Sequence, residues 1–220
     1  MISPGTINNK QILITAGPTW EAIDPVRGIT NHSSGKMGYA IAEQAFRMGA
    51  DVKLVSGPVC LPPPVGVETI QVLSAQDMYN AVHRQLDAHN IDVFIGVAAV
   101  ADYRPVSVHA QKIKKASAKL TLELIKNPDI ITSVAQLKAE RPYTVAFAAE
   151  TENLEANAHK KRVNKKLDMV IANDVSKLGT GFGTDRNQVL MITDTDTIDT
   201  GIQDKTALAE TILKHIAKHL

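Results

Sequence analysis

The most informative stretch of the chain is Asp24-Pro-Val-Arg-Gly-Ile-Thr-Asn-His-Ser-Ser-Gly-Lys-Met-Gly38. It separates a short apolar run, Ile12–Ala16, from an amphipathic segment, Tyr39–Met48. A strand, a polar loop and a helix in this order open a nucleotide-binding βαβ unit. The stretch therefore predicts an α/β protein with a ligand site beside its first helix.

The residues of this loop favour an anion at the start of the helix. Ser33 and Ser34 are of the type that caps helices, and Gly35 lets backbone approach a ligand closely. Lys36 adds positive charge where free helix N–H groups already attract an anion. A capped helix without a ligand is the simpler alternative, but it does not require the further polar residues Arg27, Asn31 and His32. We therefore expect a phosphate or carboxylate site.

The length, charge and composition of the chain restrict the class of protein. A chain of 220 residues suits one α/β domain, and a net charge of +1 gives no basic field for nucleic acid. The longest apolar stretch, Val93–Ala101, is too short to cross a bilayer, and Met1–Lys10 lacks the apolar core of a secretory signal. The single cysteine, Cys60, excludes an intrachain disulfide. We expect one cytoplasmic domain over residues 1–220 with a flexible N-terminus over residues 1–10, and neither a nucleic-acid nor a membrane partner.

Strand and helix patterns alternate along most of the chain. The predicted strands are Gln11–Ala16, Val52–Val55, Thr69–Val72, Val93–Ala99, Tyr143–Ala148, Met169–Ala172 and Val189–Thr193. The predicted helices are Gly35–Met48, Ala75–His89, Pro128–Ala139, Glu150–Leu167 and Lys205–Leu220. Alternation of this kind predicts a doubly wound, mainly parallel Rossmann-like sheet with right-handed crossovers.

One long stretch, Val100–Asn127, resists a regular assignment. It is rich in lysine, at positions Lys112, Lys114, Lys115, Lys119 and Lys126. A connection this long in a compact domain is usually functional or disordered. We predict a lysine-rich flap over about residues 100–127 that is mobile when empty and ordered over a bound nucleotide. The alternating segment Leu120–Leu124 predicts a short strand within the flap.

Two other function classes stay open on the residues alone. A nicotinamide-dependent reductase is disfavoured because Gly17-Pro-Thr is not the dinucleotide fingerprint and the second strand ends in Ser56 rather than in an acidic residue. The later glycine pattern Gly179–Gly183 precedes a strand, whereas the fingerprint requires a helix. A non-catalytic module that binds an anion through its lysines is the other alternative.

Four linked motifs identify a family resemblance. Beside Asp24–Gly38 they are Ala98-Ala-Val-Ala-Asp-Tyr-Arg104, then Lys112-Ile-Lys-Lys115 with Lys126-Asn-Pro-Asp-Ile130, and Phe147-Ala-Ala-Glu-Thr151. From Gln11 onward the chain resembles the phosphopantothenate–cysteine ligase family of coenzyme A biosynthesis, in its bacterial CTP-dependent form. Relatives of that form usually carry a flavin-dependent decarboxylase domain, which this sequence lacks, and Trp20 stands where they commonly have Arg.

The resemblance implies a two-step ligation. The carboxylate of 4′-phosphopantothenate attacks the α-phosphate of CTP, and the amine of L-cysteine then displaces CMP from the acyl-cytidylate. No His, Asp and Glu set has metal-site spacing, so Mg²⁺ would be held largely by phosphate oxygens and water. The resemblance also implies a homodimer in which one subunit helps to build the site of the other.

The resemblance further implies roles for particular residues. Asn31 and Lys112 correspond to catalytic residues, and Arg27 and Asn31 to residues that bind 4′-phosphopantothenate, although Arg27 could equally brace the loop. Lys161 and Lys165 share a helix face, where their mutual repulsion is easier to explain if a polyanion lies opposite. The residues that correspond to CTP-binding positions are Ser33, Ser34, Gly35, Gly96, Val97, Ala98, Asp102, Lys112, Pro128, Asp129, Ile130, Ile131, Phe147, Lys161 and Lys165.

Overall fold

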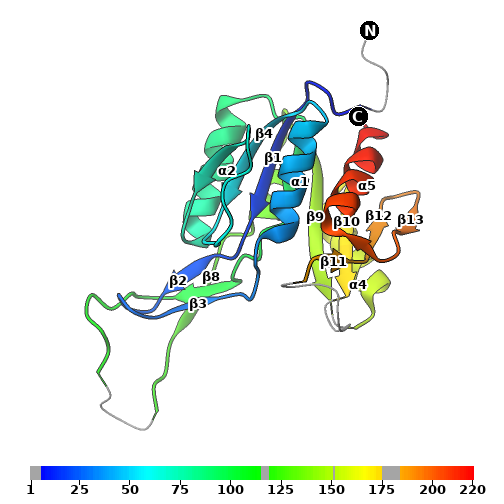
Figure 1. The fold of residues 1–220 in the computed structure, drawn as a ribbon. Helices are drawn as coiled ribbons and strands as arrows, with labels where there is room; N and C mark the ends of the chain where they lie inside the picture. Colours follow the sequence, from blue (N-terminus) through cyan, green and yellow to red (C-terminus); the bar gives the residue numbers. More distant parts are fainter. Residues whose placement is uncertain (1–5, 115–118, 151, 175–183) are drawn as a thin grey trace.

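An eight-stranded sheet forms the centre of the computed structural model, which describes residues 6–114, 119–150, 152–174 and 184–220 (Figure 1). In spatial order the strands are β13 (Thr197–Asp199), β12 (Val189–Ile192), β10 (Met169–Asp174), β9 (Tyr143–Glu150), β6 (Val93–Gly96), β1 (Gln11–Ala16), β4 (Asp51–Ser56) and β5 (Glu68–Gln71). The strands from β5 to β10 run parallel to one another, whereas β12 is antiparallel to both of its neighbours, β10 and β13. The predicted Rossmann-like fold is therefore confirmed.

The direction of strand addition reverses at β1. The chain first adds β4 and β5 on one side of β1, and then adds β6, β9 and β10 on the other side. A reversal of this kind leaves a crevice outside the carboxyl ends of the two strands that flank it, because their following connections diverge. Here the crevice lies beyond β1 and β6, where Pro18 and Ala99 form an isolated bridge.

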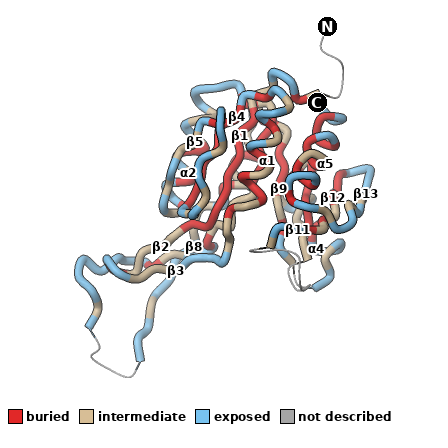
Figure 2. The backbone as a smooth tube through the Cα atoms, viewed as in Figure 1, coloured by how far each residue is buried: buried red, intermediate tan, exposed pale blue. Residues whose placement is uncertain are grey.

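Helices cover both faces of the sheet. Ile12 and Ile14 of β1 join the core beneath α1 (Lys36–Arg47) and α5 (Lys205–Ala217), whereas Leu13 joins the core beneath α2 (Ala75–Ala88) and α3 (Ile130–Ala135). The helix α4 (Leu154–Lys165) packs beside α3. Side chains on a strand alternate between faces, so the central strands, which are covered on both sides, are buried along most of their length (Figure 2).

Two small two-stranded sheets extend beyond the carboxyl ends of the main sheet (Figure 1). One pairs β2 (Trp20–Ala22) with β3 (Gly28–Thr30), and the other pairs β7 (Tyr103–Pro105) with β8 (Leu124–Lys126). We call residues 20–30, 103–114 and 119–126 together the arm. The hairpin β2–β3 was not predicted, because its strands are too short to give an alternating pattern.

The predicted strand Leu120–Leu124 is wrong. The strand runs instead over Leu124–Lys126 and pairs with β7. Its register is fixed by Asn127, whose backbone N–H donates to Asp102 O at 2.8 Å and whose side-chain amide donates to Ala101 O at 2.8 Å. These hydrogen bonds to nearby backbone outweigh the weak alternation of the sequence.

Three other boundaries differ from prediction. The helix expected over Pro128–Ala139 runs only over Ile130–Ala135, because Asp129 is its N-cap and Pro128 lies outside it. The helix expected from Glu150 begins at Leu154, because β9 continues through Glu150. Residues 6–10, expected as part of a flexible N-terminus over residues 1–10, are packed, since Ile7 is fully buried and Asn9 N donates to Gly49 O; residues 1–5 lie outside the described residues.

Candidate active site

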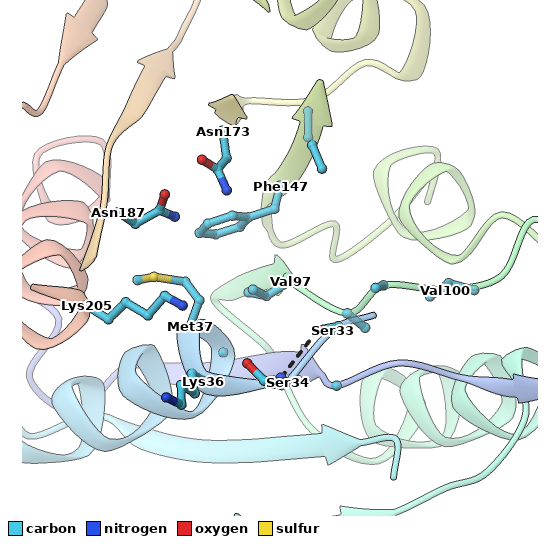
Figure 3. Close-up of a pocket in the computed structure, with 17 residues that line it drawn as sticks. Ser33, Ser34, Lys36, Met37, Val97, Val100, Phe147, Asn173, Asn187 and Lys205 are labelled. Carbon is cyan, nitrogen blue, oxygen red and sulfur yellow. Dashed lines mark hydrogen bonds between the residues drawn. The ribbon is translucent and has the colours of Figure 1, made fainter. Parts of the chain in front are cut away.

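Two adjoining cavities lie at the carboxyl ends of the central strands. The α1 cavity, about 220 Å³, is bounded by the start of α1, by residues that follow β1 and β6, and by the C-terminal half of β9 (Figure 3). The α3 cavity, about 430 Å³, lies between the segment after β6 and the helices α3 and α4. The two cavities share Ala98, Val100 and Phe147. Ligands in the two cavities would therefore meet beside these three residues.

The start of α1 offers backbone N–H groups to the α1 cavity. The N-cap is Gly35 in the left-handed conformation (φ 76°), which glycine adopts at little steric cost. Contrary to the expectation from the sequence, neither Ser33 nor Ser34 caps the helix. The hydroxyl of Ser33 accepts from Gly35 N at 3.3 Å, and no described side chain caps the first turn. The first-turn N–H groups can therefore bind an anion.

The α3 cavity contains a short charged network. Asp129 caps α3 by accepting from Thr132 N at 3.0 Å, and it also accepts from Lys165 Nζ at 2.6 Å. Lys161 Nζ donates to Phe147 O at 3.1 Å. Burial lowers the pKa of Lys161, and the positive charge of Lys165 lowers it further. Although burial acts to raise it, the pKa of Asp129 is lowered by its hydrogen bonds with Lys165 and Thr132.

Gly96 has a packing role at the floor of the α3 cavity. A Cβ atom on Gly96 would lie 1.9 Å from Ile131 Cδ1, which is far inside van der Waals contact. A side chain at position 96 would therefore displace the end of Ile131, so glycine here favours the close packing of α3 on β6 whether or not a ligand approaches the backbone.

Arg27 braces the arm. Its guanidinium donates to the carboxylate of Asp24 and, at 3.0 Å, to Ile113 O. Asp24 is buried and also accepts from the backbone N–H groups of Val26, Arg27 and Ile113. The Arg27 guanidinium, followed by these N–H donors, holds the pKa of Asp24 well below its usual range. Asp24 thus ties the hairpin to the lysine-rich segment, a role that the sequence did not indicate.

Three of the expected site residues line neither cavity. Asn31 is exposed beside the α1 cavity, where its side-chain amide donates to Ala99 O at 3.0 Å. Lys112 is exposed on the arm. Arg27 likewise lines neither cavity. Any role of Lys112 at the junction of the cavities therefore requires movement of the arm.

Most of the expected CTP-binding residues gather in the cavities. Those that line the α3 cavity are Gly96, Ala98, Asp102, Pro128, Asp129, Ile130, Ile131, Phe147, Lys161 and Lys165. Those that line the α1 cavity are Ser33, Ser34, Gly35, Val97, Ala98 and Phe147. Lining residues to which the sequence assigned no role include Met37, Val100, Tyr103, Lys126, Asn127, Asn173, Asn187 and Lys205. The glycine pattern Gly179–Gly183 lies outside the described residues.

The residues that the structure describes contain neither a metal-binding cluster nor a membrane-spanning helix. No three His, Cys, Asp or Glu side chains in that part of the chain are grouped to hold a metal ion. In the same residues, no helix combines the length and apolar character needed to cross a membrane.

Comparison with known proteins places the chain in a family. The model of the DNA/pantothenate metabolism flavoprotein C-terminal domain, DFP, matches residues 7–220. The coenzyme A biosynthesis bifunctional protein CoaBC of Vibrio vulnificus is 52% identical over 215 residues, which are 97% of this chain and 53% of that protein. CoaBC of Bacillus subtilis is 46% identical over 213 residues, 96% of this chain and 52% of that protein. The chain thus spans about half the length of these relatives.

Solved structures of known proteins share the fold of this chain. A crystal structure of the C-terminal domain of CoaBC has a TM-score of 0.82 and 44% identity, and the match covers 99% of this chain and 98% of that one. A mutant of Cab2 in complex with phosphopantothenate-cysteine has a TM-score of 0.77, with 96% of this chain and 87% of that chain covered. At 19% identity the latter supports the fold alone. On the match over residues 7–220 and the likeness to the CoaBC C-terminal domain, this chain belongs to the DNA/pantothenate metabolism flavoprotein C-terminal domain family.

Proposed function

We propose that this domain joins 4′-phosphopantothenate to L-cysteine at the expense of CTP. The observation that carries the proposal is the junction of the two cavities at Phe147, where an anion-binding helix start and a lysine-lined cavity adjoin. The residues that meet there come from segments far apart in the sequence. The relatives are named for coenzyme A biosynthesis, which agrees with this reaction class.

The proposed chemistry proceeds in two displacements. A carboxylate oxygen of 4′-phosphopantothenate bonds to the α-phosphorus of CTP, and the bond from that phosphorus to the bridging oxygen breaks, releasing pyrophosphate. The cysteine amine then bonds to the acyl carbon, CMP leaves with the former carboxylate oxygen, and the amine gives up a proton. Neither step needs a nucleophile from the protein, so the protein acts by positioning the reactants and offsetting charge.

The cavities suit a divided arrangement of the reactants. CTP would lie in the α3 cavity with its phosphates near Lys161 and Lys165, and it would reach toward the first-turn N–H groups of α1 in the adjoining cavity. The carboxylate of 4′-phosphopantothenate would approach the α-phosphate beside Phe147. Asn31 would fix the acyl phosphate at the rim, and Lys112 would arrive there when the arm closes. Closure would keep water from the acyl-cytidylate.

A magnesium ion fits this arrangement if the nucleotide carries it. Asp129 is already paired with Lys165, so Asp102 is the other carboxylate that lines the α3 cavity. Mg²⁺ is commonly held by one or two carboxylates together with substrate phosphates and water. The donor set therefore fits Mg²⁺ that is bound through phosphate oxygens, and the ion would offset the charge of the triphosphate.

The competing nicotinamide-dependent reductase finds less support. The strand β4 ends at Ser56, which is fully buried and lies 3.0 Å from the hydroxyl of Tyr39. Dinucleotide-binding folds place an acidic residue near this point to bind the ribose 2′-hydroxyl. Ser56 is instead used in packing α1 against the sheet.

The arm supports the expectation of a homodimer. It exposes a set of large apolar side chains, namely Val26, Tyr103, Val106, Val108, Leu120, Leu124 and Ile125. Apolar surface concentrated on a projecting element is typical of an interaction site. We propose that a second copy of the chain covers it. Light scattering should give a dimer that Val106→Asp with Val108→Asp disrupts, whereas Val65→Asp, away from the arm, should not; a monomeric wild-type protein with full activity would contradict this arrangement.

Product analysis tests the ligase proposal. With Mg²⁺, CTP, 4′-phosphopantothenate and L-cysteine, we expect equal amounts of pyrophosphate and CMP together with phosphopantothenoylcysteine. Omission of cysteine should stop the release of free CMP. Production of CDP and inorganic phosphate in place of CMP and pyrophosphate would contradict the proposal, because it would indicate an acyl-phosphate route.

A further inference from the structure

A buried lysine from the C-terminal part of the chain reaches the α1 cavity. Lys205 is the first residue of α5, lies more than a hundred residues beyond the loop that begins α1, and is 8% exposed. Its side chain lines the cavity and in Figure 3 directs its ammonium group into it, whereas Lys36 extends away. The sequence analysis treated Lys205 only as the start of a helix.

The position is unfavourable for a cation. The N-terminus of a helix carries partial positive charge, so a lysine at the first position of α5 is repelled by the helix dipole. Burial removes the ammonium group from water and lowers the pKa of Lys205, and the nearby charge of Lys36 lowers it further, while Asp185 opposes this. A methionine would fill similar volume without these costs. An anion bound in the cavity would offset the unfavourable burial of the Lys205 ammonium group.

Lys205 also makes structural contacts. Its Nζ donates to Thr184 O at 2.5 Å, and its backbone N–H donates to Asp185 O at 2.9 Å. These bonds attach the segment before β11 (Arg186–Asn187) to the start of α5. They aim the ammonium group, and any test must separate this anchoring role from binding.

The same wall of the cavity carries two amides. Asn187 is 3% exposed and lines the cavity, and Asn173 at the end of β10 lines it as well. The side-chain oxygen of Asn173 is buried and has no hydrogen-bond partner among the described residues. Buried polar atoms are normally satisfied, so this orphaned atom indicates that a ligand or an ordered water completes the cavity.

We propose that Lys205 binds a phosphate group in the α1 cavity, together with the N–H groups at the start of α1. A helix start and a buried ammonium group that line one small cavity form a complementary pair for a phosphate, since both act over short distances in a water-poor site. Two sources of phosphate exist under the proposed function, on which this choice rests: the polyphosphate of CTP and the phosphate monoester of 4′-phosphopantothenate.

Binding without turnover separates the two sources. Calorimetric titration of Lys205→Met is carried out with CTP against cytidine, and with 4′-phosphopantothenate against pantothenate. A charge-assisted hydrogen bond makes about a tenfold or larger difference in Kd. We expect such a loss for the phosphate-bearing ligand of one pair and little change for its phosphate-free analogue. The ligand pair in which the phosphate-bearing member loses affinity shows which phosphate Lys205 binds.

Lys53→Met is the matched control. Lys53 is 7% exposed, pairs with Glu68 at 2.6 Å and lines neither cavity, so the substitution removes an equally buried lysine elsewhere. It should leave all four affinities unchanged. Lys205→Arg, which keeps the charge, should retain more affinity for the phosphate-bearing ligand than Lys205→Met. If Lys205→Met fails to fold, NMR of the lysine Cε signals in the wild-type protein should show a shift of Lys205 with that ligand and none with its analogue.

The possible results of these titrations either support the proposal for Lys205 or overturn it. Unchanged affinity of a folded Lys205→Met for both phosphate ligands, with only a lower melting temperature, would overturn the proposal and leave Lys205 as an anchor for Thr184. Equal losses for a phosphate ligand and its analogue would also overturn it. A Lys205-dependent affinity for CTP in a protein that forms no phosphopantothenoylcysteine would support this inference while contradicting the proposed function.

Discussion

Lys165 and Asp129 connect the last turn of α4 to the N-cap of α3 through an ion pair of 2.6 Å at the edge of the α3 cavity. The carboxylate thus performs two tasks, since it also caps α3. Asp129 would repel a triphosphate if Lys165 did not offset its charge. The pair therefore orders both helices before any ligand binds and leaves the cavity suitable for an anion.

A double-mutant cycle tests this relationship. Lys165→Ala should weaken CTP binding by about 1–3 kcal/mol, because it removes a charge-assisted contact and exposes the phosphates to Asp129. Adding Asp129→Asn, which keeps the cap, should recover part of the loss. The exposed neighbour Lys160, changed to Ala, should have little effect in the same calorimetric titration. Equal losses of CTP affinity from Lys160→Ala and Lys165→Ala would show that α4 acts only as a general basic surface and that Lys165 makes no specific contact.

The pH dependence of CTP binding should reflect Lys161. Because burial and the charge of Lys165 lower its pKa, Lys161 loses its proton at a lower pH than an ordinary lysine, near 10.5. The charged form binds phosphate, so affinity for CTP should fall as the pH rises through this lowered pKa. In Lys161→Met the affinity should be weaker at neutral pH and should lack this alkaline decline. An identical pH profile in the variant would show that Lys161 does not contact the phosphates.

Gly96 and Ile131 should behave as a packing pair. Gly96→Ala should destabilise the protein by about 1–3 kcal/mol, since the new methyl group overlaps Ile131 Cδ1. Ile131→Val removes that carbon, so the double variant should recover much of the stability in urea unfolding. A single Gly96→Ala variant as stable as the wild type would mean that α3 shifts freely on β6, contrary to the close packing in the structure.

The arm should respond to CTP. We expect amide exchange over residues 105–114 and 119–123 to slow when CTP binds. Asp24→Asn should speed exchange at Ile113 in the free protein, because the carboxylate that accepts its N–H is lost. Acid should act similarly: the lowered pKa of Asp24 means that its stabilising contribution is present above pH 3.8, its ordinary pKa, and is lost as the pH falls through the lower folded-state pKa. Strong protection of the free arm, unchanged by CTP, would make it a rigid extension.

The sequence predicted the parts of the fold that rest on long periodic segments. The apolar run at Val93–Gly96 and the alternation of strands and helices were sufficient for the parallel sheet, because burial on both faces leaves an unambiguous pattern. It did not predict the hairpin around Asp24, whose strands hold three residues each and depend on tertiary hydrogen bonds. The shift of β8 has the same origin, since Asn127 fixes it from outside the strand.

The candidate site was predictable where motifs are contiguous and not where a single residue arrives from a distant element. Asp129 belongs to a motif and Lys161 to the basic helix that follows another motif, and the structure brings both to one cavity. Lys205 lies in no such motif, and only the packing of α5 beside α1 brings it to the α1 cavity. The one available signal was a lysine at a helix start, where the dipole disfavours it. That signal is too weak to be read without the fold.

The central claim is that an acyl-cytidylate forms, and oxygen transfer tests it most directly. 4′-Phosphopantothenate labelled with ¹⁸O in its carboxylate is incubated with CTP, Mg²⁺ and L-cysteine, and the products are measured by mass spectrometry. The two displacements predict that one labelled oxygen leaves with the phosphate of CMP for each amide formed. Unlabelled CMP with the label in pyrophosphate, or CDP with the label in inorganic phosphate, would contradict the account, because the carboxylate would then have attacked the β- or the γ-phosphorus.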